Sequence, residues 1–275
     1  MSLFRCPICF APLTCGERTY TCPNGHSYDI SKEGYVHLLP PNQMHSKAPG
    51  DDKAMVAARN RFLSAGYYQP LRAALEELAL RYTPASGAVV DSGCGEGYYT
   101  AGIARVLREA GRAPTVAGID ISKFALRWAA KRDRESEFAV GSAYRLPVAD
   151  SCAHLLVNCF SPLAVREFHR VLKPGGVFLY VVPAPEHLWE LKEVLYDTPY
   201  LNPDETIPYE GFQLLEVVPV ESVLHIESPE DLHALFQMTP YCWKTTRAGT
   251  ARLHALTRLE VRAGFRIHVF RRDML

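Results

Sequence analysis

Residues 88–100 read Ala-Val-Val-Asp-Ser-Gly-Cys-Gly-Glu-Gly-Tyr-Tyr-Thr, and this stretch decides the fold. Its apolar start indicates a buried strand, and the apolar residues that follow it recur at helical spacing. The glycines between strand and helix let backbone approach a ligand closely. Free amides at the start of the helix, around Tyr99 and Thr100, can face a carboxylate. The pattern therefore predicts a site for a nucleotide-type ligand.

A second expected strand, residues 115–119, ends in Asp120, twenty-three residues after Gly97. Dinucleotide-binding folds place an acid at this distance on the ribose hydroxyls. The loop reads G-x-G-x-G, however, and lacks the G-x-x-G ending of nicotinamide sites. Strands and helices alternate from residue 88 to residue 182, which predicts an α/β fold with a mainly parallel sheet. Its ligands should bind at the carboxyl ends of the strands.

Upstream of this unit, the motifs Cys6-Pro-Ile-Cys9 and Cys22-Pro-Asn-Gly-His26 form two short clusters. Two tight turns that each present two soft donors match a tetrahedral zinc site, so we expect Cys6, Cys9, Cys22 and His26 to bind zinc. Cys15 has no partner nearby and stays outside the set. Zinc with four protein ligands has no open position, so we assign it a structural role. Ordinary thiols and a redox motif are the alternatives, and the histidine disfavours the second.

Composition sets limits on partners and compartment. The 275 residues carry 30 basic and 30 acidic side chains, so attraction to nucleic acid must come from local patches. The longest apolar run is far short of the roughly 20 residues that cross a bilayer. The N-terminus lacks the pattern of a secretory signal. We expect a cytoplasmic protein with no membrane partner.

Charge is segregated along the chain. Residues 186–231 hold twelve acidic side chains against Lys192 alone, whereas the tail after Trp243 is rich in arginine. We expect the acidic segment either to lie away from RNA or to pack on another basic surface. Lys123, Arg127, Lys131 and Arg134 recur at helical spacing. We interpret this stripe as a solvated helix face, with a polyanion-binding face as the alternative.

The glycine loop with Asp91 ahead of it and Asp120 after the second strand resembles the class I S-adenosylmethionine (SAM)-dependent methyltransferases, which are Rossmann-like. Further matches are Ser142-Ala143 before Arg-Leu-Pro, and Leu-Lys-Pro-Gly-Gly at 172–176 before a strand at 177–182. The resemblance implies that SAM is the cofactor and that Ser142 and Ala143 border its adenine. The other cofactor-binding residues it implies around the loop are Asp91, Gly93, Gly95, Glu96, Tyr99, Thr100 and Asp120.

The order of all the motifs resembles one family, the 23S ribosomal RNA guanine-N1 methyltransferases. The matching pieces are the zinc motifs, Lys32 to Pro40, Gly66 to Leu71, the glycine loop from Asp91 to Thr100, and Gln237 to Pro240. The loop resembles the branch that modifies guanine-745. The resemblance implies that Tyr68 and His187 belong to the cofactor pocket, that a 23S rRNA hairpin or a pre-ribosomal particle is the partner, and that the protein is a homodimer. We expect a zinc-binding domain (1–45), a helical linker that completes the cofactor pocket (46–86) and a methyltransferase domain (87–275).

Methyl transfer to guanine N1 needs an aligned acceptor and a destination for the N1 proton. Asn158, after the fourth strand, is expected to hydrogen-bond near the methyl group, or else to be a satisfied loop amide. An amide is not an effective base, and the sequence indicates no other. A splayed guanine is held by stacking on aromatic rings, and Phe160 is the first candidate. Others are Tyr98, Tyr241 and Trp243.

Three hypotheses remain open. The first is an RNA methyltransferase whose zinc domain grips RNA together with Arg59, Arg61 and the basic stripe. The second is a small-molecule methyltransferase with a purely structural zinc site, which the zero net charge favours. The third is a non-enzymatic zinc module, which the intact glycine loop and Asp120 disfavour. Two positions depart from the family pattern: His154 replaces an acid before the fourth strand, and Ser161 replaces an alanine before Pro162.

Overall fold

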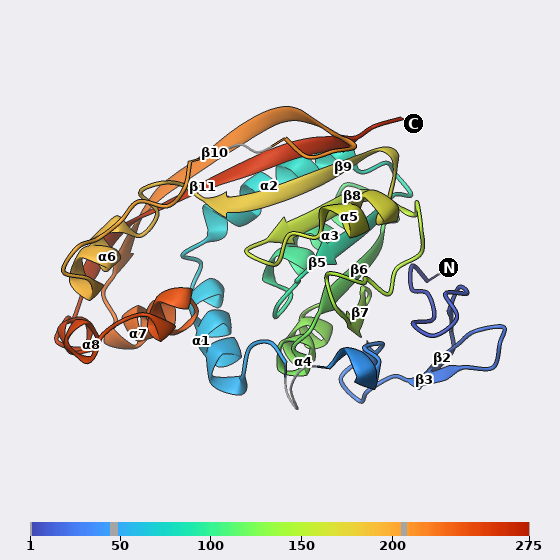
Figure 1. The fold of residues 1–275 in the computed structure, drawn as a ribbon, viewed down its shortest axis with the longest axis horizontal. Helices are drawn as coiled ribbons and strands as arrows, with labels where there is room; N and C mark the ends of the chain where they lie inside the picture. Colours follow the sequence, from blue (N-terminus) through green and yellow to red (C-terminus); the bar gives the residue numbers. More distant parts are fainter. Residues whose placement is uncertain (1, 45–48, 205–207, 275) are drawn as a thin grey trace.

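The computed structural model describes residues 2–44, 49–204 and 208–274 (Figure 1). Helices flank a long twisted sheet, and the two ends of the sheet carry different appendages. The helices are α1 (Lys53–Ser64), α2 (Gln69–Tyr82), α3 (Tyr98–Glu109), α4 (Lys123–Arg132), α5 (Val165–Val171), α6 (Trp189–Leu195), α7 (Pro229–Gln237) and α8 (Arg247–His254). The strands are β1 (Thr14–Cys15), β2 (Thr19–Thr21), β3 (Ser27–Asp29), β4 (Tyr35–His37), β5 (Ala88–Ser92), β6 (Thr115–Asp120), β7 (Glu137–Val140), β8 (Ala153–Cys159), β9 (Leu172–Pro183), β10 (Phe212–Ile226) and β11 (Leu259–Arg272).

The main sheet has eight strands in the order β10-β11-β9-β8-β5-β6-β7-β4. The strands from β4 to β9 pair in parallel, and β11 is antiparallel to both of its neighbours. The chain runs outward from β5 through β6 to β7 and then returns to β8 on the other side of β5. This reversal is a topological switch point, where open α/β sheets bind their ligands. The expected α/β class and mainly parallel sheet are confirmed.

The N-terminal segment joins this sheet. Strands β1, β2 and β3 form a small antiparallel sheet, whereas β4 pairs in parallel with β7 at the edge of the main sheet. Phe4, Leu13 and Cys6 share one buried cluster with Leu38 and Val148. The apolar core is therefore continuous from the zinc-binding segment to the large sheet. The expected boundary at residues 45/46 lies outside the described residues.

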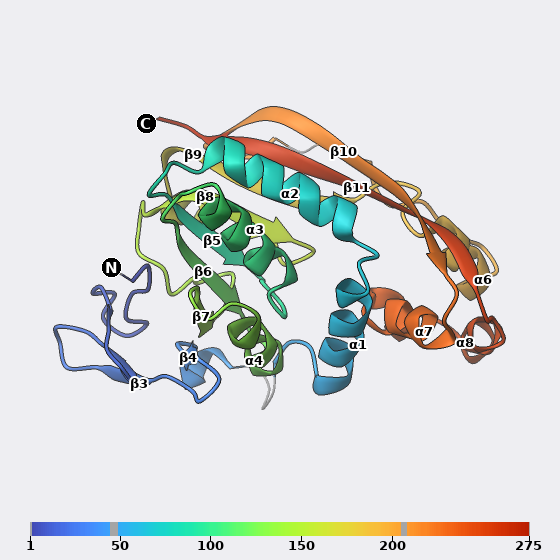
Figure 2. The same cartoon turned by 180° about the vertical axis from the view of Figure 1, so that it is seen from behind.

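Strands β9, β10 and β11 extend past the rest of the sheet and reach α6, α7 and α8 at their far end (Figure 2). Helix α1 packs between α7 and α4. Asp52 caps α1 by accepting a hydrogen bond from the Met55 amide, and Ser228 caps α7 in the same way. The Ser122 hydroxyl donates to the Asp51 carbonyl at 2.6 Å, which places the start of α1 beside the segment that follows β6.

The acidic segment packs against the arginine-rich tail, which is one of the two arrangements we expected for it. Arg262 forms ion pairs with Glu186 and Glu190, Arg266 pairs with Asp204, and Arg252 lies 3.0 Å from Asp197. Acidic and basic side chains that are separated in the sequence thus neutralise each other in the folded protein.

One local expectation was wrong. Strand β9 begins at Leu172 rather than at Val177, because Leu172 already pairs with Ala153 before the register shifts. Pro70 lies in the first turn of α2, where a missing N–H is tolerated. Within the described residues, none of the helices combines the length and apolar character needed to cross a membrane.

Candidate functional site

The glycine loop lies at the switch point between β5 and β8. Gly93, Gly95 and Gly97 have φ angles of +83°, +55° and +81°, a left-handed backbone that favours glycine. The amides of Gly93 and Cys94 donate to the carbonyl of Ile119 at 2.7 and 3.1 Å, which ties the loop to the end of β6. The loop backbone is therefore fixed before any ligand arrives.

Asp120 holds the loop from the neighbouring strand. Its Oδ2 accepts a hydrogen bond from the Gly95 amide at 2.9 Å, and its Oδ1 accepts one from the Ser122 amide at 2.7 Å. Burial raises the pKa of Asp120, and these two hydrogen bonds oppose the shift. Each carboxylate oxygen can accept a further hydrogen bond, so the acid can also bind hydroxyl donors.

Two more buried acids come from β5 and from the glycine loop that follows it. Asp91 Oδ2 accepts a hydrogen bond from the Thr100 hydroxyl at 2.5 Å, and burial raises the pKa of Asp91 to about 7 despite this bond. Glu96 is 1 % exposed, and its Oε2 accepts from the Tyr98 amide at 2.9 Å and lies 3.6 Å from Arg132. Burial raises the pKa of Glu96 as well. The site thus concentrates carboxyl groups where water is scarce.

Unpaired buried polar atoms cluster around this loop. Such atoms are uncommon in folded proteins, and each costs about 1–3 kcal/mol unless a partner arrives. Among the described residues, those at this site are Asp91 Oδ1, Ser92 Oγ, Glu96 Oε1, Tyr99 OH, Asn158 Oδ1 and His187 Nδ1. SAM carries an ammonium group and ribose hydroxyls that can donate to such acceptors. The residues present therefore fit the cofactor.

Tyr68 and His187 approach the site from the α1–α2 connection and from the segment after β9. The two rings lie 6.2 Å apart, and each packs on Phe265, at 4.9 and 4.7 Å. Burial, with the nearby charge of Lys192, lowers the pKa of His187 to about 3, so its ring is neutral. His187 precedes α6, and Leu188 between them has a φ of +56°.

The end of β8 carries both candidate acceptor-site residues. The Asn158 amide nitrogen donates to the carbonyl oxygens of Ser92 (3.2 Å) and Pro162 (3.2 Å) and to Ser161 Oγ (2.8 Å). Its donors are therefore satisfied within the fold, and only Oδ1 stays unpaired. Phe160 has a φ of +55°, a strained backbone for this residue type, and its ring is 49 % exposed. It packs 5.6 Å from Phe265, so the fold holds an exposed aromatic ring at the rim.

The remaining candidates lie at different distances from the loop. Ser142 and Ala143 follow β7, and the Gly141 amide donates to the Asp120 carbonyl at 3.0 Å, which places them beside that acid. Tyr98 and Tyr241 are buried, which excludes them as open stacking platforms. Trp243 is 72 % exposed and lies in the short helix Pro240–Trp243, which precedes α8.

Sequence patterns did not reveal two features of the site. Arg59 forms an ion pair with Asp51, and its guanidinium lies 4.0 Å from where a side chain on Gly95 would start. Ser161 covers Gly93 so closely that a Cβ there would lie 2.2 Å from its hydroxyl. Arg61 pairs with Asp231 at 2.5 Å, so neither arginine is a free cation. The contacts of Arg59 with Gly95 and of Ser161 with Gly93 join segments that are distant in sequence, so local spacing could not predict them.

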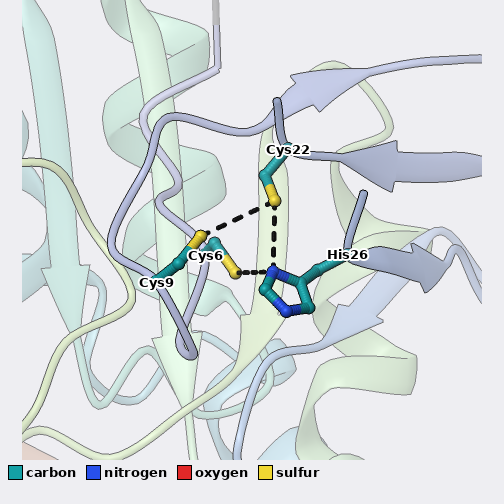
Figure 3. A group of neighbouring side chains, drawn as sticks. All are labelled: Cys6, Cys9, Cys22 and His26. Atoms are coloured by element: carbon teal, nitrogen blue, oxygen red, sulfur yellow. Dashed lines mark hydrogen bonds between the residues drawn. The ribbon is translucent and has the colours of Figure 1, made fainter. Parts of the chain in front are cut away.

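Figure 3 shows the zinc centre, where Cys6 and Cys9 face Cys22 and His26. Cys6, Cys9, Cys22 and His26 place their ligand atoms within 4.8 Å of one another. The Cys9 and Cys22 sulfurs are 3.7 Å apart, and His26 Nδ1 lies 3.5 and 3.4 Å from the sulfurs of Cys6 and Cys22. A tetrahedron with Zn–S of about 2.3 Å and Zn–N of about 2.0 Å has edges of about 3.5–3.8 Å. The donor set therefore fits zinc.

Comparison with known proteins finds a family match for the N-terminal segment and another for the central part of the main sheet. Residues 4–47 match a zinc-ribbon family described as RlmA, N-terminal, and residues 90–180 match a methyltransferase domain family. The X-ray structure of YjhP from E. coli has the same fold: it aligns with 80 % of this chain and 99 % of its own, with 15 % identity and a TM-score of 0.51. Fold and site together define a class I SAM-dependent methyltransferase with an N-terminal zinc ribbon.

Two relatives specify the family. A 23S rRNA (guanine(748)-N(1))-methyltransferase from Streptomyces fradiae is 40 % identical over 194 residues, which cover 70 % of this chain and 67 % of that protein. A candidate 23S rRNA (guanine-N(1)-)-methyltransferase from Bacillus subtilis (strain 168), YxjB, is 31 % identical over 258 residues, 90 % of this chain and 89 % of its own. The chain belongs to the family of 23S rRNA (guanine-N1)-methyltransferases, and it is a SAM-dependent enzyme with a zinc ribbon.

Proposed function

We propose that this protein methylates N1 of one guanine in a hairpin loop of 23S rRNA, and that this guanine is 745. The observation that carries the reaction is the cluster of unpaired buried acceptors at the glycine loop, next to the half-exposed ring of Phe160. A cofactor pocket beside a solvent-facing aromatic ring suits an unpaired base presented by a large substrate. A small molecule would favour a closed pocket, so this arrangement supports the RNA hypothesis over the small-molecule alternative.

The chain's own residues bind and orient the reactants. When bound, SAM supplies a methyl group that its sulfonium has already activated. Asp91 and Glu96 offer carboxylate oxygens to the cationic part of the cofactor, and Asp120 offers its own to the ribose hydroxyls. Ser142, Ala143, Tyr68 and His187 complete the pocket, and the neutral ring of His187 adds no charge that would repel a cation.

Two residues are assigned to the guanine that accepts the methyl group. Phe160 supplies the ring on which guanine stacks, and Asn158 Oδ1 accepts a hydrogen bond beside it. Neither an amide nor a histidine with a pKa of about 3 is a strong base, so we assign the N1 proton to water at the exposed rim. Catalysis then rests on alignment and on exclusion of bulk water from the reacting atoms.

The deciding experiment is incubation of unmodified 23S rRNA with methyl-labelled SAM, followed by mapping of the labelled nucleotide. We expect label at guanine-745 and its loss in Asp120→Ala. Label at guanine-748 would keep the reaction and reject the position, and the Streptomyces fradiae relative makes this the main competing site. An absence of label in any RNA would overturn the function.

Two further expectations accompany this function. We propose that the protein works in the cytoplasm, where ribosomal RNA is processed, and that it forms a homodimer. Light scattering on the zinc-loaded protein should give twice the monomer mass of 30.8 kDa. A single monomeric species at micromolar concentration would reject the dimer without touching the reaction.

A further inference from the structure

The outer face of α4 carries an uninterrupted line of cations. Lys123, Arg127 and Lys131 are spaced four residues apart and Arg134 continues the line, and all four side chains are exposed. One helical turn separates neighbours by about 6 Å. Because α4 starts after Ser122, two residues beyond Asp120, the line begins beside the cofactor-binding edge of the sheet.

A cavity lies at the other end of this line, against the zinc ribbon. It has a volume of about 480 Å³ between the turn Ser31–Gly34 and the end of α4. Lys32, Lys131 and Arg134 line it. Of the acids there, Glu33 lies 3.9 Å from Arg127, and Asp133 lies 3.1 Å from Arg108. The cavity is therefore cationic.

Most of the cations on this face make no ion pair. Within the described residues, no ion pair includes Lys32, Lys123, Lys131 or Arg134. In the arginine-rich tail, by contrast, Arg252, Arg262 and Arg266 pair with the acidic segment. A chain of zero net charge thus keeps a patch of free positive charge on the α4 side.

Aromatic rings are interleaved with the cations. Trp128 is 45 % exposed on the same helix. The Phe124 ring has Lys53 at 5.6 Å, Lys123 at 5.5 Å and Arg127 at 5.9 Å from its centroid. Basic side chains with exposed aromatic rings are the pattern of single-stranded nucleic-acid grooves, where the cations follow phosphates and the rings stack with bases. An acidic protein surface would need the cations but not the rings.

We propose that a set of residues here named the α4 track binds the RNA strand that flanks the target guanine: Lys32, Lys123, Arg127, Lys131 and Arg134 contact its phosphates, and Trp128 stacks with a base. The inference rests on the proposed function and adds the route of the RNA to it. The strand runs from the cofactor edge along α4 to the cavity against the zinc ribbon. The zinc ribbon thereby acts on RNA through Lys32 and the position of its turn.

The test compares two variants of equal charge. Lys32→Gln/Lys131→Gln/Arg134→Gln removes the cavity cations, and Arg166→Gln/Arg258→Gln/Arg271→Gln removes three exposed arginines elsewhere. Binding to a protein-free 23S rRNA fragment that contains the hairpin is measured across a salt series. We expect the first variant to weaken binding by at least about 20-fold and to lower the slope of log Kd against log salt by about 2–3, since each lost phosphate contact contributes about 0.7–0.9. The second variant should stay within about threefold of the wild type.

Two readouts keep the outcomes separate. SAM affinity and zinc content must match the wild type in both variants, which shows that the fold is intact. If the wild type methylates the fragment but the two variants bind it equally well, the α4 track is wrong and the function stands. If the first variant loses activity only on a ribosomal particle while it binds free RNA normally, a ribosomal protein is the partner of this face and the RNA assignment is overturned. If the wild type methylates no RNA, the proposed function is rejected, and the α4 track, which rests on it, is rejected too.

Discussion

Asp91 holds a proton in the free protein at mildly acidic pH, because burial raises its pKa to about 7. An unfolded chain loses that proton near pH 4, so this group's contribution to stability falls as the pH rises from about 4 to about 7. A cationic cofactor favours the ionised form. We therefore predict that SAM binding releases up to one proton between pH 5.5 and 7 and strengthens with pH until it levels off above about 7.

Asp91→Asn should abolish this pH dependence and weaken SAM binding at pH 8 by about 10–100-fold, or about 1.4–2.8 kcal/mol. Calorimetry in buffers of different ionisation enthalpy measures the released proton. Glu135→Gln, a change at an exposed acid, is the control and should behave like the wild type. An affinity that stays flat from pH 5.5 to 7.5 in the wild type would contradict the assignment of Asp91.

A separate prediction concerns Phe160, which we assign to the acceptor side because of its strained backbone and its exposure. Phe160→Ala should lower kcat/KM for RNA by about 5–150-fold, the worth of one stacked base at about 1–3 kcal/mol. SAM affinity should change less than about twofold. Phe160→Tyr keeps the ring and should retain most activity. A loss of SAM binding as large as the loss of activity would reassign Phe160 to the cofactor pocket.

The sequence could predict the parts of the site that depend on local spacing. The glycines lie on a turn that demands positive φ, and the acid after the next strand of a parallel sheet lies beside that turn for geometric reasons. The packing of Ser161 over Gly93 and the approach of Arg59 to Gly95 could not be predicted, since both depend on how distant segments meet. Asn158 shows the intermediate case: its place at a strand end was predictable, but which of its atoms stays unpaired was not.

At the scale of elements, the zinc ribbon and the large sheet depend on each other. Strand β4 pairs with β7, and Phe4 packs in the same cluster as Val148. Local patterning could not predict this partner, because strand pairing across about a hundred residues is set by the fold as a whole. A short segment of this kind gains much of its folding free energy from its metal.

We therefore predict that zinc removal destabilises more than the ribbon. Cys22→Ser should lower the melting temperature of the whole protein by at least about 6 °C, which corresponds to roughly 2–3 kcal/mol for a chain of this size. Cys15→Ser is the matched control: its thiol is exposed and lies outside the donor set, so zinc content and melting temperature should not change. A Cys22→Ser protein with the melting temperature of the wild type would contradict this prediction. It would mean that the stability of the protein does not depend on the metal.

At the scale of the molecule, paired and unpaired charges lie in different places. The acidic segment neutralises part of the arginine-rich tail at the end that carries α6 and α8, while the free cations gather along α4. Net charge, which is zero, is a poor guide to whether such a protein binds RNA. The distribution of ion pairs in the fold decides it, and composition alone does not contain that information.

This arrangement predicts that salt weakens the binding of RNA strongly and the binding of SAM hardly at all. RNA binding through about four phosphate contacts should weaken by about 60-fold between 50 and 200 mM monovalent salt. SAM binding, which depends on buried carboxyl groups within a few ångströms of the ligand, should change by less than about twofold because screening acts mainly between exposed charges. Filter binding with RNA and calorimetry with SAM, on one preparation, give both numbers. A salt-insensitive RNA affinity would leave the cations of α4 as a solvated helix face and would return the small-molecule reading to first place.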